Sequence, residues 1–269
     1  MKYKLIATDF DDTLLTSEKK VLDSTKEIIE KHKDKGFKIV GVTARTLNSS
    51  LDSIPIEIFD YIIGNNGAFI YDVLDNKTIY ESNISKQQLF SITTDIKKQS
   101  KQIDYCSINN YYILKNEQET SKGMPDFIKP IEGIKDVSEN ICRMNVFLED
   151  REDIKKVLAF LQNKYHNLNS FIMQPSNTSK QWIVVNPFDT NKVTALSYLG
   201  EKLNIDLSEM IFFGDGLNDL ELIKKVGCGV AMGNAIEEVK EGARYVTTSN
   251  EEGGISAFLR NKQKCKKIN

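Results

Sequence analysis

Short apolar segments alternate with helix-like segments at both ends of the chain. The apolar segments have the length and continuous hydrophobic character of buried strands, and they occupy residues 4–10, 37–43, 61–65, 210–213, 228–232 and 245–248. Between them, apolar positions three and four residues apart predict helices over 22–35, 191–204, 218–226 and 235–242. Strands separated by helices pair in parallel within one sheet. The pattern therefore predicts an α/β fold.

The pattern differs in the middle of the chain. The predicted elements there are hairpins over 68–82 and 105–115, helices over 85–100 and 151–164, a strand over 143–149 and a strand pair within 170–187. Hairpins with interspersed helices indicate an α+β module. We therefore expect a Rossmann-like parallel-sheet core made of residues 1–80 and 187–269, interrupted by an inserted α+β domain at 81–186.

Charge, hydropathy and cysteine spacing limit the partners of the protein. The formal net charge of −2 gives no general attraction to nucleic acid or acidic membranes. No apolar run approaches the ~20 residues of a membrane span, and no signal-peptide pattern precedes the apolar strand at Leu5. The cysteines are too scattered for a disulfide framework or a metal motif; they are Cys106, Cys142, Cys228 and Cys265. We expect a cytoplasmic protein without a nucleic-acid or membrane partner, as a monomer or weak homodimer.

Histidine usage excludes several mechanisms. The chain has only His32 and His166, both in helix-like, lysine-rich surroundings. The chain therefore offers almost no histidine for a serine–histidine–acid triad or a histidine-rich zinc site. The phosphate-binding patterns GxxxxGK[ST] and GxGxxG are absent as well. Acids and lysines must carry any chemistry.

Three predicted strands end in polar clusters. Residues 9–13 (DFDDT) follow the first strand, 43–45 (TAR) follow the second, and 214–219 (GDGLND) follow the strand at 210–213. The carboxyl ends of the strands in an open parallel sheet line the ligand crevice. The clusters, although far apart in sequence, are therefore expected to converge.

Such convergence would bring together Asp9, Asp11, Asp215 and Asp219. Carboxylates that share a site raise one another's pKa values. A hard divalent cation removes this conflict, and Mg²⁺ prefers a few carboxylates with water and phosphate oxygens. For any single aspartate, capping of a helix or turn is a competing interpretation. The two motifs together, each at the end of an apolar strand, favour a metal site.

These motifs resemble the four ordered motifs of the haloacid dehalogenase (HAD) superfamily. The resemblance is carried by DFDDTLL at 9–15, Thr43, Lys192 and GDGLNDLEL at 214–222. NNGA at 65–68 and the large insertion are similar to those of its Cof-type phosphatases. The resemblance implies a Mg²⁺-dependent phosphatase that hydrolyses small phosphorylated metabolites, such as sugar phosphates or phosphorylated cofactors, through an aspartyl phosphate. It also implies that the inserted domain is a mobile cap.

The resemblance implies a role for each site residue. Asp9 is the expected nucleophile, and Asp11 is the expected general acid and base. The expected Mg²⁺ ligands are the Asp9 carboxylate, the Asp11 backbone carbonyl and Asp215, with Asn218 and Asp219 in or near the shell of residues that surrounds these ligands. The expected phosphate-binding groups are the backbone amides of Phe10 and Ala44 and the side chains of Thr43 and Lys192.

Four positions depart from the family pattern. Asp12 replaces a usual glycine, Ala44 and Val193 each replace a common glycine, and Val184 stands where many relatives carry an acid. Aspartate tolerates positive φ better than most residues, so we expect the loop at Asp12 to keep its form. The departures concern substrate choice and leave the hydrolytic residues intact.

Two alternatives to the phosphatase remain open from sequence. A phosphomutase shares the nucleophile and the acid but protects the aspartyl phosphate from water. A non-catalytic phospho-ligand-binding protein could use the same fold, although binding alone needs no acid at position 11.

Overall fold

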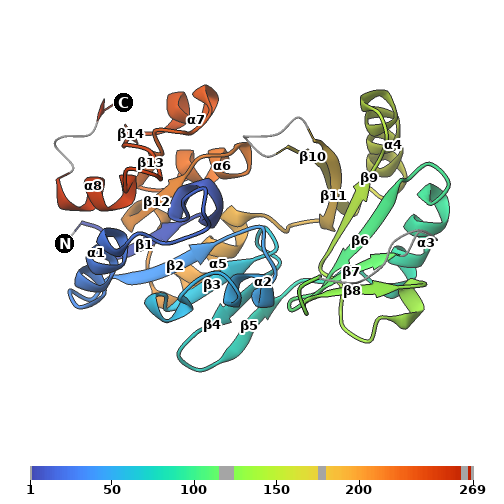
Figure 1. The fold of residues 1–269 in the computed structure, drawn as a ribbon, viewed down its shortest axis with the longest axis horizontal. Coiled ribbons are helices and arrows are strands. Elements are labelled where there is room, and N and C mark those ends of the chain that lie inside the picture. The colour runs from blue at the N-terminus through green and yellow to red at the C-terminus, as the bar shows by residue number, and fades with distance from the viewer. Residues whose placement is uncertain (1, 115–123, 175–179, 262–265, 268–269) are drawn as a thin grey trace. The chain divides into compact units, whose positions relative to one another are not determined.

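A computed structural model describes residues 2–114, 124–174, 180–261 and 266–267 of the chain. The chain divides into two compact units, whose elements are drawn in Figure 1. The first unit comprises Met1–Ala44, Leu51–Ile79 and Asn191–Asn269, and the second comprises Arg45–Ser50 and Tyr80–Thr190. All of the expected site residues fall in the first unit.

A nine-stranded sheet runs through the first unit in the order β15-β14-β13-β12-β1-β2-β3-β4-β5. Its strands are β1 (Leu5–Thr8), β2 (Lys38–Val42), β3 (Tyr61–Gly64), β4 (Phe69–Asp72), β5 (Lys77–Glu81), β12 (Met210–Gly214), β13 (Cys228–Ala231), β14 (Tyr245–Val246) and β15 (Lys266–Lys267). The strands from β14 to β3 pair in parallel. Every residue of β1 is buried, which is typical of a parallel strand covered on both faces. The α/β class with a parallel-sheet core is thus confirmed.

Helices cover both faces of this sheet. They are α1 (Asp23–Lys33), α5 (Lys192–Leu203), α6 (Leu217–Lys225), α7 (Glu237–Gly242) and α8 (Gly254–Arg260). The unit also contains the short helical turns η2 (Ile56–Ile58) and η4 (Leu207–Glu209) and the turn η1 (Phe10–Leu14), whose backbone is non-helical at Asp11 and Asp12. From β1 the chain crosses through α1 to β2, and from β12 it crosses through α6 to β13, in opposite directions along the sheet. Right-handed crossovers therefore place α1 and α6 on opposite faces. Consistent with this, α8 contacts α1, whereas α5 and α7 contact α6 (Figure 1).

The second unit is built on a six-stranded sheet in the order β10-β11-β9-β6-β7-β8. Its elements are α3 (Lys86–Ile96), β6 (Gln102–Cys106), β7 (Tyr111–Leu114), β8 (Ile128–Ile131), η3 (Ile134–Asp136), β9 (Arg143–Phe147), α4 (Arg151–Lys164), β10 (Leu168–Met173) and β11 (Trp182–Pro187). Apolar side chains of α3 and α4 form one buried cluster with alternate residues of the strands. The short helix α2 (Leu47–Leu51) begins in this unit, where the Leu47 amide donates to the Ile108 carbonyl at 2.7 Å.

The sequence predicted neither a membrane span nor a disulfide framework, and the described residues bear on both expectations. Within them, no helix combines the length and the apolar character needed to cross a membrane. Among the described residues, Cys106, Cys142 and Cys228 are buried and form no disulfide. Cys265 lies outside the described residues.

Candidate active site

The strands β1 and β12 lie side by side at the centre of the sheet, and their following connections run in opposite directions. Such a switch point opens a crevice beyond the carboxyl ends of the two strands. Asp9 follows β1 and Asp215 follows β12. The Asp9 amide donates to the Phe213 carbonyl at 2.9 Å, which ties the two strand ends together. The expected convergence of the first and last motifs is therefore present in the structure.

A buried ammonium group joins two of the aspartates. Lys192 Nζ lies 2.7 Å from Asp9 Oδ1 and 2.7 Å from Asp219 Oδ1. Lys192 is the first residue of α5, and the side chain of Asn191 caps this helix by accepting from the Thr194 amide at 2.9 Å. The helix start thus fixes the lysine against the aspartates, and its ammonium contacts carboxylates within the protein itself.

Asp219 uses its second oxygen to hold the loop after β12. Its Oδ2 accepts hydrogen bonds from the backbone amides of Asp215 and Gly216, each at 3.1 Å. Both oxygens of Asp219 are therefore engaged, one by Lys192 and the other by two amides. Asn218, expected beside the same metal site, is half-buried on the first turn of α6.

Burial dominates the electrostatics of the cluster. It raises the pKa of Asp9 well above its usual range; Lys192 opposes this shift, and Asp219 and Asp215 add to it. Burial and the neighbouring Asp219 raise the pKa of Asp215 to about 7. Burial would lower the pKa of Lys192, but Asp219 and Asp9 raise it above its ordinary value. The lysine of the cluster therefore stays charged, but its single positive charge does not balance the negative charge of the three carboxylates.

The cluster can be tested as a place for a divalent cation. Asp9, Asp215 and Asp219 each offer a carboxylate oxygen, all within 4.8 Å of one another. Three carboxylates and one ammonium carry a net charge of about −2 when ionised, which a divalent cation balances. Because both oxygens of Asp219 are engaged, Asp9 and Asp215 are the more available ligands. The donor set fits a hard cation that prefers oxygen ligands.

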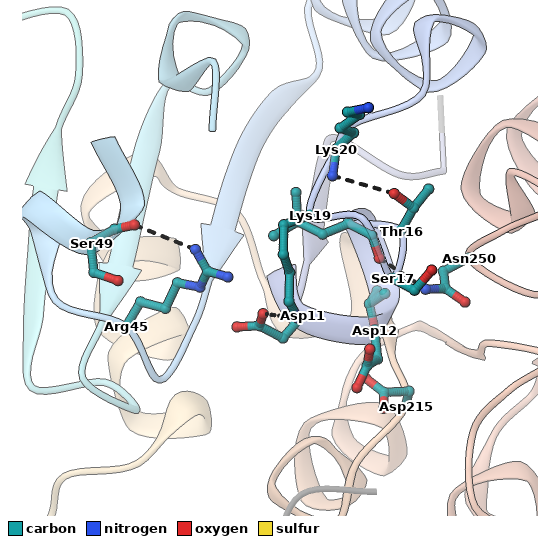
Figure 2. Close-up of polar contacts among 12 residues, drawn as sticks. Asp11, Asp12, Thr16, Ser17, Lys19, Lys20, Arg45, Ser49, Asp215 and Asn250 are labelled. Carbon is teal, nitrogen blue, oxygen red and sulfur yellow. Dashed lines mark hydrogen bonds and ion pairs between the residues drawn. The ribbon is translucent and has the colours of Figure 1, made fainter. Parts of the chain in front are cut away.

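The loop after β1 brings further polar residues to this site, and Figure 2 shows Asp12 beside Asp215. Asp12 has φ 57°, the left-handed conformation expected where relatives carry glycine. Its backbone carbonyl accepts from Asn234 Nδ2 at 2.7 Å. Asp11 differs from Asp9: its carboxylate forms an exposed ion pair with Lys19 at 2.9 Å (Figure 2). Of the four aspartates expected together, Asp9, Asp215 and Asp219 have carboxylate oxygens within 4.8 Å of one another, whereas the Asp11 carboxylate pairs with Lys19.

The expected phosphate-binding residues lie on the neighbouring strand ends. Thr43 is buried after β2, and its carbonyl accepts from the Asn66 amide at 2.9 Å. Ala44 follows it and is half-buried. Phe10 has its ring in the core beside Phe59, so only its backbone could take part. Val193 and Val184, which depart from the family pattern, are both buried apolar residues.

Sequence reasoning gave no role to three residues that the structure places around the site. Thr13 donates to Asp215 Oδ1 at 2.8 Å, and Lys19 pairs with Asp11. Asn66 contacts Thr43 through its backbone. Asn66 had a signal, the Asn-Asn-Gly segment after β3, because this composition favours left-handed backbone. Thr13 and Lys19 had no such sequence signal, because their contacts with Asp215 and Asp11 depend on the backbone conformation of the loop after β1.

Comparison with known proteins agrees with this geometry. A family model of haloacid dehalogenase-like hydrolases matches residues 6–259. The 5-amino-6-(5-phospho-D-ribitylamino)uracil phosphatase YcsE of Bacillus subtilis is 30% identical over 258 residues, which are 96% of this chain and 94% of that protein. The solved structure of the HAD phosphatase BT1666 from Bacteroides thetaiotaomicron has a TM-score of 0.78 and 26% identity, over 96% of this chain and 94% of that one. The HAD subclass IIB sugar phosphatase BT4131 has a TM-score of 0.77 and 25% identity, over 96% of this chain and 98% of that one.

The doubly wound fold and its aspartate–lysine cluster define a hydrolase class, and the chain belongs to the haloacid dehalogenase-like hydrolases. Within that class it is a phosphoric monoester hydrolase. The expected HAD relationship of Cof type is confirmed.

Proposed function

We propose that the protein is a Mg²⁺-dependent phosphatase that hydrolyses small phosphorylated metabolites through an aspartyl phosphate on Asp9. The observation that carries this proposal is the buried cluster at the switch point, where Lys192 contacts both Asp9 and Asp219 at 2.7 Å. A structural role alone would not require three buried carboxylates within 4.8 Å of one another.

The first half-reaction uses Asp9 as a nucleophile. One carboxylate oxygen forms a bond to phosphorus while the bond from phosphorus to the ester oxygen breaks. Asp11, as a carboxylic acid, gives its proton to the departing oxygen. The exposed ion pair of Asp11 with Lys19 must open for this step, and an exposed pair of this kind is weak.

The second half-reaction restores the enzyme. The Asp11 carboxylate accepts a proton from water, whose oxygen bonds to phosphorus as the bond to Asp9 breaks. Thr43 and the amides of Phe10 and Ala44 would donate to phosphoryl oxygens, and Lys192 would offset their charge. Helix α5 begins at Lys192, so the positive end of its dipole would also favour the negative charge of the phosphoryl group.

We assign the cation to Asp9, Asp215 and the Asp11 carbonyl, with Asn218 and Asp219 supporting them. A bound Mg²⁺ would supply the positive charge that favours the ionised carboxylates and the charged phosphoryl group. The raised pKa values of Asp9 and Asp215 support this assignment, because both carboxylates are short of positive charge without a cation.

The relatives suggest which substrates to test first. Three Bacillus subtilis relatives, YcsE, YwtE and YitU, are named as phosphatases of 5-amino-6-(5-phospho-D-ribitylamino)uracil. BT4131 is named a sugar phosphatase. We propose a substrate among sugar phosphates and phosphorylated cofactors or their precursors, with the second unit acting as a cap that selects the non-phosphate part.

Phosphate release from a panel of these metabolites tests the proposal. Wild-type protein with Mg²⁺ should release many equivalents of phosphate per enzyme, whereas a mutase would stop near one. Asp9→Asn should abolish turnover, because an amide is a poor nucleophile. The matched control is Asp23→Asn, at an exposed aspartate in the first turn of α1. Substantial turnover by a pure, folded Asp9→Asn protein, or full activity in excess chelator, would refute the proposal.

A further inference from the structure

The turn between β3 and β4 has an unusual backbone. Asn65, Asn66 and Gly67 have φ values of 48°, 58° and 103°, so three consecutive residues are left-handed. Asparagine and glycine tolerate this conformation better than other residues. The Gly67 amide donates to the Gly64 carbonyl at 2.9 Å, which closes the turn. The backbone thus accounts for the choice of Asn or Gly at each position, but not for a particular side chain.

This turn lies between two elements of the candidate site. On one side the Asn66 amide donates to the Thr43 carbonyl at 2.9 Å. On the other side Gly67 meets the residue before Lys192, since a Cβ on Gly67 would collide with the Asn191 carbonyl. Asn66 is therefore held beside the loop of Thr43 and close to the start of α5, both of which carry expected phosphate-binding groups.

The side chain of Asn66 is buried without a hydrogen bond. Asn66 is 4% exposed, and neither its Oδ1 nor its Nδ2 has a partner among the residues that the structure describes. An unsatisfied buried amide is costly, and such groups in native proteins call for an explanation. Glycine would satisfy the left-handed backbone without that cost. The backbone conformation alone therefore gives no reason for an amide side chain at position 66.

We propose that Asn66 binds the phosphoryl group of the substrate, with Nδ2 donating to a phosphoryl oxygen beside Thr43. The inference rests on the proposed phosphatase function. Asp9 and Lys192, which are assigned to the reacting phosphate, are buried as Asn66 is. Burial of the Asn66 side chain is therefore compatible with contact to the same phosphoryl group. A hydrogen bond from a neutral amide to a charged oxygen is stronger than one between neutral groups.

Two substitutions separate the amide from the backbone. Asn66→Gly keeps the left-handed turn and removes the amide, whereas Asn66→Asp keeps the shape and replaces the donor with a negative charge. Asn76→Gly is the control, because Asn76 is also left-handed, with φ 52°, but lies on an exposed turn of the same unit. The probe is inorganic phosphate with Mg²⁺, titrated by calorimetry, together with the melting temperature of each protein.

Asn66→Gly should weaken phosphate binding roughly 10- to 100-fold, the effect of losing one hydrogen bond to a charged group. Asn66→Asp should weaken it further, and Asn76→Gly should bind as wild type does. The melting temperature of metal-free Asn66→Gly should not fall, because no bond within the protein is lost.

Equal phosphate affinity in wild type and Asn66→Gly would overturn the inference. A lowered melting temperature with unchanged binding would also overturn it, and would show that the amide holds buried water. If wild type binds phosphate but hydrolyses no ester, the proposed function fails while the phosphate affinities still decide the role of Asn66. If wild type itself binds no phosphate, the inference fails as well.

Discussion

Raising the pH should destabilise the metal-free protein, because Asp215 must then ionise in a buried site. Its pKa in the folded protein is about 7, whereas an aspartate in an unfolded chain has a pKa of about 3.9. Between these values the folded state keeps a proton that the unfolded state has released. The contribution of Asp215 to the free energy of unfolding therefore falls as the pH rises through this window and becomes level above about pH 7.

The magnitude follows from the single site. For a folded pKa of about 7, raising the pH from about 5.5 to about 7.5 lowers the free energy of unfolding by about 2 kcal/mol. The pKa of Asp9 is raised by the same burial, so its ionisation acts in the same direction. Thr13 donates to Asp215 Oδ1, which opposes the shift.

Urea denaturation in a chelator, across this pH range, measures the effect. The matched variant is Asp215→Asn, whose Oδ1 can still accept from Thr13 but which cannot ionise. The difference between the two proteins reports the ionisation of Asp215 together with its effect on the pKa of Asp9, because the histidines and the surface ion pairs are common to both. Saturating Mg²⁺ should stabilise wild type more at the higher pH, since its ligands must be deprotonated. A metal-free wild type as stable at about pH 7.5 as at 5.5, or an equal decline in Asp215→Asn, would refute the reasoning.

Three further outcomes follow from the same contacts. Asp11→Asn should slow hydrolysis of sugar phosphates by roughly 10²- to 10⁴-fold but affect an aryl phosphate less, since a stable leaving group needs no proton; equal losses in single-turnover assays would contradict its role as the acid. Lys192→Met should lower the free energy of unfolding of the metal-free protein by about 3–5 kcal/mol in urea, because buried carboxylates lose their cation. The exposed Lys202→Met on the same helix should have little effect. Gly214→Ala should cost about 1–3 kcal/mol by the same assay, because its Cβ would lie 2.6 Å from that of Asp219; unchanged stability would contradict this close contact.

The pattern of apolar segments was sufficient to predict the parallel sheet because its strands are buried on both faces. The runs before Asp9 and Asp215 became β1 and β12, which pair in parallel. Smaller elements gave too little signal. The strand β8 (Ile128–Ile131) has four residues, one of them Pro130, and shows no clear alternation. The segment 45–50 groups with the second unit through long-range contacts that local sequence does not encode.

The location of the candidate site followed from topology, but its side-chain contacts did not. Strand order alone brings Asp9 close to Asp215, whatever the rotamers. The lysine at position 192 was expected to face the phosphoryl group, whereas its ammonium contacts Asp9 and Asp219 in the structure. A sequence motif gives the chemical groups available at a site, and packing decides which of them meet before a ligand binds.

The spacing of the GDGLND segment has a physical reason that the sequence did not reveal. Asp219 folds back on the end of β12, so its Oδ2 accepts from the amides of Asp215 and Gly216 while its Oδ1 contacts Lys192. A side chain at position 214 would occupy that space, which explains the glycine there. One buried carboxylate thus fixes the loop that carries a candidate metal ligand and also the lysine that contacts the candidate nucleophile. Substitution of Asp219 would disturb both together, so a loss of activity in such a variant would reflect the positioning of these groups and would not require contact with the substrate.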